Sequence, residues 1–283
     1  MSLCMENETL KDRENKRILR SYELLSKVKR TKVVHVRDDQ YEFPWLLDSA
    51  RISRKKGHRF GVIDTGKLDC LQLEWLAEAG ADIYTSNEAR PKPEELELLS
   101  RTVKKGKAIM VFFHHGALET EERENLASFG LLKKIGRNGV YIHLSNRERE
   151  HNFSVLHELA FACRDGGSWV VYYHHGGFVP QVLDLARKGI WVHLSDKGLQ
   201  SEEEQSLFTE AIKTHHGRRL RFVLHVEKGL TKSFLKAALR AGAIVLPKGS
   251  ITSRRSPLLA LENKARKAKL DSKAYYLSTS FLP

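Results

Sequence analysis

Short apolar segments alternate with amphipathic segments along the whole chain, and this alternation constrains the fold more than any other feature. The apolar segments are nearly continuous, as in strands buried on both faces, and the segments between them have helical spacing. Glycine ends several helical segments just before the next apolar one, which is typical of a helix C-cap. The pattern therefore predicts parallel strands at 33–36, 60–63, 81–84, 108–113, 140–144, 169–173, 190–194, 220–226 and 243–246, with a further candidate at 274–277.

Two kinds of strand end alternate along the chain. The first kind is a polar pair followed by glycine, and each kind recurs roughly every 50–60 residues. The repeat is therefore a βαβα unit in four copies. The first kind comprises Asp64-Thr65-Gly66, His114-His115-Gly116, His174-His175-Gly176 and Glu227-Lys228-Gly229. The second kind comprises Ser86-Asn87, Ser145-Asn146, Ser195-Asp196 and Gly249-Ser250.

Four double units supply eight strands, and eight parallel strands with right-handed crossovers close into a (β/α)8 barrel. The alternative that the same alternation allows is an open doubly wound parallel sheet. We expect a repeated core at 58–250, which forms one domain with two extensions. The extensions are an N-terminal basic segment with one strand at 1–57 and a C-terminal basic helix and tail at 251–283.

The charge balance favours anionic partners. The chain has 283 residues, with 48 Lys and Arg against 35 Asp and Glu, and a formal net charge of +13. Such a charge suits phosphorylated substrates, nucleic acid or an acidic surface. Three cysteines without a Cys-x-x-Cys pair argue against disulfides and a cysteine zinc site. We expect a cytoplasmic protein without membrane contact, since no apolar run has the length of a span or a secretory signal.

The polar ends of the first kind of strand predict a metal site. In a barrel the active site lies at the carboxyl ends of the strands, where alternate strands contribute inward side chains at one level. Imidazoles and carboxylates are ligands of catalytic zinc or manganese, and such a metal lowers the pKa of bound water. The predicted ligands of this divalent metal are Asp64, His114, His174 and Glu227. A His-His pair puts its two side chains on opposite faces, so at most one of each pair points inward.

The second kind of strand predicts acid–base residues. His143 and His193 each lie two residues before a serine, and period-2 alternation puts each histidine on the same face as its serine. We predict that His143 and His193 act as the general acid or base. The predicted substrate-binding residues are His115, His175, Ser145, Ser195, Lys228 and Lys248.

These residues support three functions. The first is a metal-dependent hydrolase that acts on an anionic phosphoester at the carboxyl face of the barrel. The second is a non-enzymatic barrel that binds RNA or protein, and it rests on the net charge and on basic segments at 27–30, 51–56 and 264–269. The third is a metal-free lyase or isomerase with His143 or His193 as the base. The polar strand ends also have a structural interpretation, since they can hydrogen-bond the turn before each glycine.

Overall fold

A computed structural model describes residues 10–247 apart from 107, 116–117, 119–128, 148–149, 200, 214–220, 227–230 and 241. The chain divides into two compact units, of which the first comprises Met1–Phe112 with Asn125–Ala127 and the second comprises Phe113–Glu124 with Ser128–Pro283. The expected division into an extension at 1–57, a core at 58–250 and a tail at 251–283 stays a prediction. Among the described residues, no helix combines the length and the apolar composition that crossing a bilayer requires.

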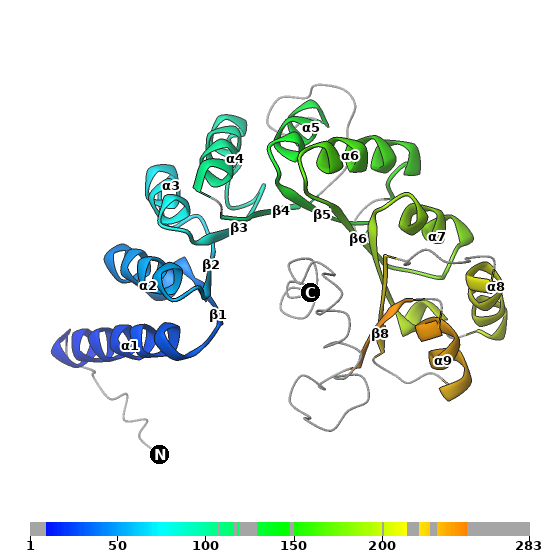
Figure 1. Ribbon diagram of the computed structural model, residues 1–283, viewed down its shortest axis with the longest axis horizontal. Coiled ribbons are helices and arrows are strands. Elements are labelled where there is room, and N and C mark those ends of the chain that lie inside the picture. Colours follow the sequence, from blue (N-terminus) through cyan, green and yellow to red (C-terminus); the bar gives the residue numbers. More distant parts are fainter. Residues whose placement is uncertain are drawn as a thin grey trace, which may run out of the picture. The chain divides into compact units, whose positions relative to one another are not determined.

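The first unit alternates helices with parallel strands (Figure 1). Its elements are α1 (Leu10–Arg30), β1 (Val33–Arg37), η1 (Asp38–Gln40), α2 (Phe43–Lys55), β2 (Arg59–Ile63), α3 (Cys70–Glu78), β3 (Asp82–Ser86) and α4 (Pro93–Gly106). Strand β2 pairs in parallel with β1 and with β3. Strand β4 (Met110–His114) carries the chain from the first unit into the second.

The second unit continues the same alternation. Its elements are α5 (Phe129–Arg137), β5 (Tyr141–Ser145), α6 (Phe153–Asp165), β6 (Val170–His174), α7 (Pro180–Arg187), β7 (Trp191–Ser195), η2 (Asp196–Leu199), α8 (Glu202–Lys213), β8 (Phe222–Val226), α9 (Lys232–Arg240) and β9 (Ile244–Pro247). From β6 to β9, each strand pairs in parallel with the strand that precedes it in the sequence.

The strand order confirms the predicted fold class. Strands β1 to β9 overlap the nine predicted segments, and the candidate at 274–277 lies outside the described residues. Within each unit the order of the paired strands never reverses, whereas a doubly wound sheet needs such a reversal. Crossovers of one hand that advance in one direction keep the helices on one face of the sheet. Figure 1 shows the helices of each unit on one side of its strands. This is the winding of a (β/α) barrel.

Local sequence explains where the helices begin and end. Helix α3 starts with a capping box, in which the Asp69 side chain accepts from the backbone N–H of Gln72 at 2.7 Å and the Gln72 side chain accepts from that of Asp69 at 3.2 Å. Gly80, Gly139 and Gly189 follow α3, α5 and α7 with positive φ, a conformation that ends a helix at little cost only for glycine. These glycines confirm the predicted turns before β3, β5 and β7.

Candidate functional site

The ring contacts of β6 show which side chains of the second unit share a face of its sheet. Tyr172 lies 6.5 Å, centroid to centroid, from Phe153 of α6, so it faces the helices. The next residue, Tyr173, instead contacts the rings of His143 on β5 and His193 on β7. Because strand side chains alternate, His143, Tyr173 and His193 lie on the face turned away from the helices, which we call the inner face.

Four polar rings form a row across the inner face, contributed by β5, β6, β7 and β8. His143 Nδ1 lies 3.0 Å from the Tyr173 hydroxyl, and His193 Nδ1 lies 2.9 Å from His225 Nε2. The strand register places Tyr173 directly opposite His193, and adjacent strands are only about 4.8 Å apart. We call His143, Tyr173, His193 and His225 the imidazole row; each is at most 8% exposed.

Burial favours the uncharged forms of three members of the row, His143, Tyr173 and His193, at neutral pH. It lowers the pKa of His143 to about 3 and raises that of the Tyr173 phenol. The pKa of His193 falls well below its usual value, first through burial and then through its neighbours His225 and His143. Among the described residues, the Nε2 atoms of His143 and His193 have no hydrogen-bond partner. Such an atom costs about 1–3 kcal/mol when buried, so it calls for an explanation, and a bound ligand or water is one.

The two predicted serines close the turns that follow β5 and β7. The backbone N–H of Arg147 donates to Ser145 Oγ at 3.1 Å, and that of Lys197 donates to Ser195 Oγ at 3.3 Å. The same bond in both places explains why the repeat carries serine there. Both serines are half-buried at the carboxyl ends of their strands. Their role in substrate binding stays a prediction.

In each His-His pair, the first histidine, which is the predicted metal ligand, lies on the helix side of the sheet rather than on the inner face. Phe113 lies 4.8 Å from the His143 ring, so on β4 it takes the inner phase and His114 takes the helix-side phase. On β6 the His174 ring lies 6.0 Å from Tyr172, and its Nε2 bonds the Gly177 carbonyl at 3.0 Å. By alternation, the second histidine of each pair is therefore the one on the side of the inner face. These are His115 and His175, which are both exposed.

Asp64 has the same helix-side phase on β2. Gly61 lies on the face of β2 where His35 Nε2 of β1 meets the Tyr84 hydroxyl of β3 at 3.0 Å. A Cβ atom on Gly61 would collide with both rings, so glycine makes this His–Tyr contact feasible. Asp64 is three residues further along and faces the other way. The first unit thus also contains a His–Tyr contact, which runs from β1 to β3 across Gly61, whereas His143 and Tyr173 lie on adjacent strands.

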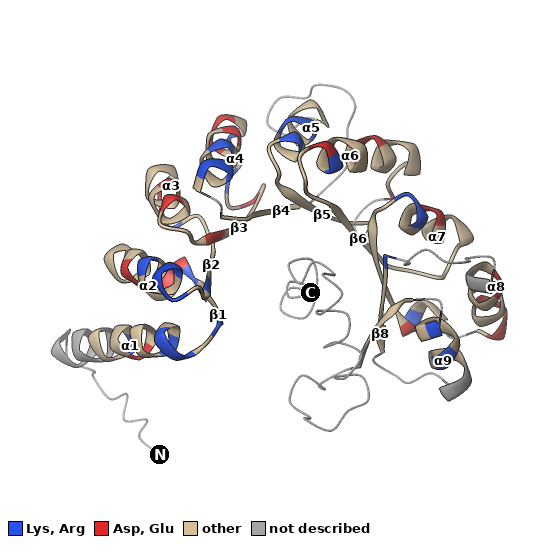
Figure 2. Cartoon of the chain, in the orientation of Figure 1, with Lys and Arg blue, Asp and Glu red and all other residues tan. Residues whose placement is uncertain are grey.

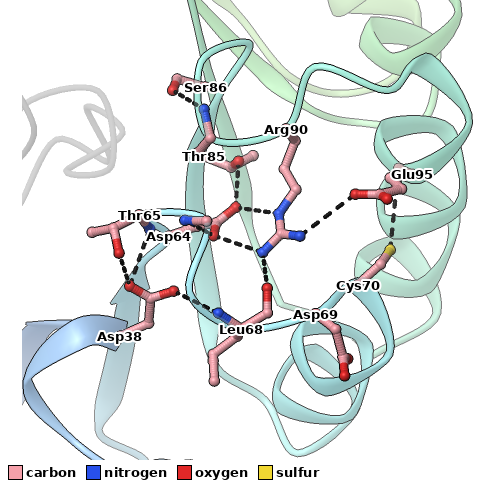
Figure 3. Close-up of polar contacts among 12 residues, drawn as sticks. Asp38, Asp64, Thr65, Leu68, Asp69, Cys70, Thr85, Ser86, Arg90 and Glu95 are labelled. Carbon is pink, nitrogen blue, oxygen red and sulfur yellow. Dashed lines mark hydrogen bonds and ion pairs between the residues drawn. The ribbon is translucent and has the colours of Figure 1, made fainter.

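Protein donors saturate the Asp64 carboxylate (Figure 3). Arg90 donates from Nε to Oδ2 at 2.8 Å and from Nη2 to Oδ1 at 2.9 Å. Thr85 Oγ1 and the Gly66 N–H add bonds of 2.7 and 2.9 Å. The side chains of Asp64 and Arg90 are 0% and 8% exposed, so this is a buried bidentate ion pair. The geometry assigns Asp64 to holding together the ends of β2 and β3.

A second repeated hydrogen bond joins the two kinds of strand end. Asp38, directly after β1, accepts from Thr65 N at 3.0 Å and from Thr65 Oγ1 at 2.6 Å (Figure 3). Asn146, directly after β5, accepts from His175 N at 2.6 Å and donates to the His175 carbonyl at 3.0 Å. Thr65 and His175 are equivalent residues of the repeat. At these positions the polar residues hydrogen-bond the turns that follow the strands, which is the structural interpretation that the sequence also allowed.

Replacing Asn146 with alanine should lower the free energy of unfolding by about 1–2 kcal/mol, because it leaves the His175 N–H without its acceptor. Asn146→Asp keeps the acceptor for the His175 N–H but loses the donor to the His175 carbonyl, so it should restore only part of the loss. Urea unfolding at pH 7 measures both. Gln181→Ala, at an exposed position of α7, is the control and should change little. An Asn146→Ala variant as stable as the parent protein would contradict this role.

The metal prediction gains no further support from the described residues. Among them, no group of three His, Cys, Asp or Glu side chains could hold a metal ion. Glu227, Lys228 and Lys248 lie outside the described residues. Sequence reasoning missed Tyr173, His225 and Arg90. The alternation of side chains along a strand was the signal that could have identified Tyr173 and His225. No local sequence pattern links Arg90 to Asp64, which lies 26 residues away.

No family model matches the chain, and no curated protein matches its sequence. Solved structures show distant likeness. D-psicose 3-epimerase with D-fructose is 15% identical, covers 75% of this chain and 97% of its own, and has a TM-score of 0.34. The 3-dehydroquinate dehydratase of Aquifex aeolicus VF5 is 14% identical over 61% of this chain and 83% of its own, with a TM-score of 0.33. A putative fructose-1,6-biphosphate aldolase from Coccidioides immitis is 16% identical over 84% and 93%, with a TM-score of 0.32.

Proposed function

We propose that this chain is an enzyme that transfers protons on a small anionic substrate, as an isomerase or lyase does, with neutral imidazoles as acid and base. The observation that carries the proposal is the pair of buried Nε2 atoms, on His143 and His193, that lack a partner among the described residues. Each imidazole is oriented through its other nitrogen by a neighbour in the row. Oriented imidazoles with one free nitrogen are suited to proton transfer.

The hydrogen bonds support a different proposed role for each histidine. Burial keeps the Tyr173 phenol protonated, so its hydroxyl donates to His143 Nδ1 and leaves the proton of His143 on Nε2. A neutral imidazole of low pKa donates such a proton to an oxyanion that develops on the substrate. His193, when it donates from Nδ1 to His225, presents an Nε2 lone pair and acts as the base.

The metal-dependent phosphoesterase expected from the sequence has weaker support. Asp64, one of its four predicted ligands, is neutralised by Arg90, and His174 Nε2 bonds the Gly177 carbonyl. The free Nε2 atoms lie on the inner face, opposite to the phase of His114 and His174. The proposed acid and base use the Nε2 atoms of His143 and His193, which lack a partner among the described residues, whereas a metal would have to compete with the protein partners of Asp64 and His174 Nε2.

Exchange of substrate C–H protons for deuterium tests the proposal. The full chain is incubated in D2O with a panel of phosphorylated and carboxylated aldoses, ketoses and 2-hydroxy acids, and mass spectrometry detects deuterium at carbon. We expect exchange that survives a chelator and falls at least a hundredfold in His143→Gln and His193→Gln, which is the usual contribution of a general acid or base.

His157→Gln is the matched control, because His157 is a half-buried histidine of α6 outside the imidazole row. Its exchange rate should equal that of the parent protein. Exchange that the chelator abolishes, or that returns with zinc or manganese, would favour the metal-dependent site instead. Exchange that is unchanged in both His143→Gln and His193→Gln would overturn the proposal.

A further inference from the structure

The helix-to-strand turns before β1 and β2 bring seven cationic side chains together in the first unit. Two bonds hold these turns side by side: Arg59 N donates to the Lys32 carbonyl at 2.7 Å, and His58 Nδ1 lies 2.9 Å from the Val28 carbonyl. We call the surface that they form the basic surface. It comprises the exposed residues Lys27, Lys29, Arg30, Lys32, Arg54, Lys55 and Lys56.

Within the described part of the chain, ion pairs do not neutralise the charges of the basic surface. Among the described residues, no carboxylate forms an ion pair with any of the seven. Arg54 donates one hydrogen bond, to the carbonyl of Glu78. Figure 2 shows the blue of Lys and Arg at the end of α1 that leads into β1, and on α2 beside it.

Helix-dipole compensation does not by itself account for this density of charge. Cations favour the last turn of a helix, and Lys27, Lys29 and Arg30 occupy that place in α1. In the same unit, helix α3 ends with no basic residue in its last turn and α4 ends with two, whereas α1 ends with three. Lys32 and Lys56 lie beyond the last residues of α1 and α2. The basic surface therefore contains more cationic residues than the ends of its two helices require.

We propose that the basic surface binds the phosphodiester backbone of a nucleic acid without reading its bases. Its cations are exposed and spread over two turns, which suits a chain of phosphates better than one small anion. Five of the seven are lysines, which act as point charges rather than as planar bidentate donors. Neither turn exposes a large hydrophobic side chain, whereas a membrane-binding surface combines basic with apolar residues.

Fluorescence anisotropy of a labelled 20-nucleotide oligouridylate, titrated with the full chain at 50 to 200 mM KCl, tests this proposal. The triple variant Lys29→Glu, Lys55→Glu and Lys56→Glu should bind at least about tenfold more weakly at 50 mM KCl. The slope of log K against log salt should become shallower by about 2, since each phosphate contact with a single strand contributes about 0.7.

The matched control is Lys67→Glu, Lys92→Glu and Arg147→Glu, which changes the net charge equally at exposed positions elsewhere. It should keep most of the affinity, and an equal loss would assign binding to net charge and overturn the proposal. Absence of oligouridylate binding at 50 mM KCl, or binding only to phosphatidylserine vesicles, would also overturn it. If the glutamate variant does not fold, the corresponding glutamine variant must still show the shallower salt slope.

Discussion

Replacing Arg90 with methionine should lower the free energy of unfolding by about 3–5 kcal/mol, because it leaves the Asp64 carboxylate buried without its cation. The Asp64 side chain is 0% exposed, and Arg90 bonds both of its oxygens and also the Leu68 carbonyl. Methionine keeps much of the volume of the arginine stem, so the loss reports the missing charge and hydrogen bonds. Urea unfolding at pH 7 measures the change.

The control for Arg90→Met is Lys92→Met, which removes an exposed Lys92–Glu95 ion pair and should change stability by less than about 1 kcal/mol. Combining Arg90→Met with Asp64→Leu should recover a large part of the loss, since a well-packed apolar pair often replaces a buried ion pair at little cost. A loss below 1 kcal/mol for Arg90→Met would show that Asp64 does not depend on this cation.

Acid should destabilise the second unit through the imidazole row at a pH where most carboxylates are still ionised. His143 has a pKa of about 3 when folded and an ordinary value of 6.5. Above pH 6.5 it is neutral in both states and contributes no pH dependence. Below pH 6.5 the unfolded chain binds a proton that the folded chain does not, so stability falls until the pH reaches the folded pKa. His143 alone should therefore cost about 2 kcal/mol between pH 7 and pH 5.

Urea unfolding at pH 7 and pH 5 in parallel measures this effect. His143→Gln removes the titrating group, so its loss of stability over this range should be about 2 kcal/mol smaller than that of the parent protein. His157→Gln, with a partly exposed ring on α6, should reduce the loss by less than half of that amount. An identical pH dependence in the parent protein and in His143→Gln would show that His143 does not stay neutral in the folded protein.

Much of the fold follows from local pattern. Apolar runs and C-cap glycines such as Gly139 located all nine described strands, because a strand buried on both faces leaves a contiguous apolar signature. The recurring strand ends also predicted the repeat, because the turns reuse one hydrogen bond, which Asp38 makes to Thr65 and Asn146 makes to His175. Local sequence therefore determined the βα alternation and the strand positions. It also determined the alternation of side chains that puts His143 and Ser145 on one face.

Tertiary structure alone decided which face each polar side chain takes and which partner it finds. Period 2 separates Tyr172 from Tyr173, but only the packing of Tyr172 on Phe153 makes Tyr173 the inner residue. In the same way Asp64 faces Arg90, 26 residues later, and His193 meets His225, 32 residues later. The physical reason is that strand pairing and helix packing are long-range contacts, whereas periodicity constrains only neighbours along the chain.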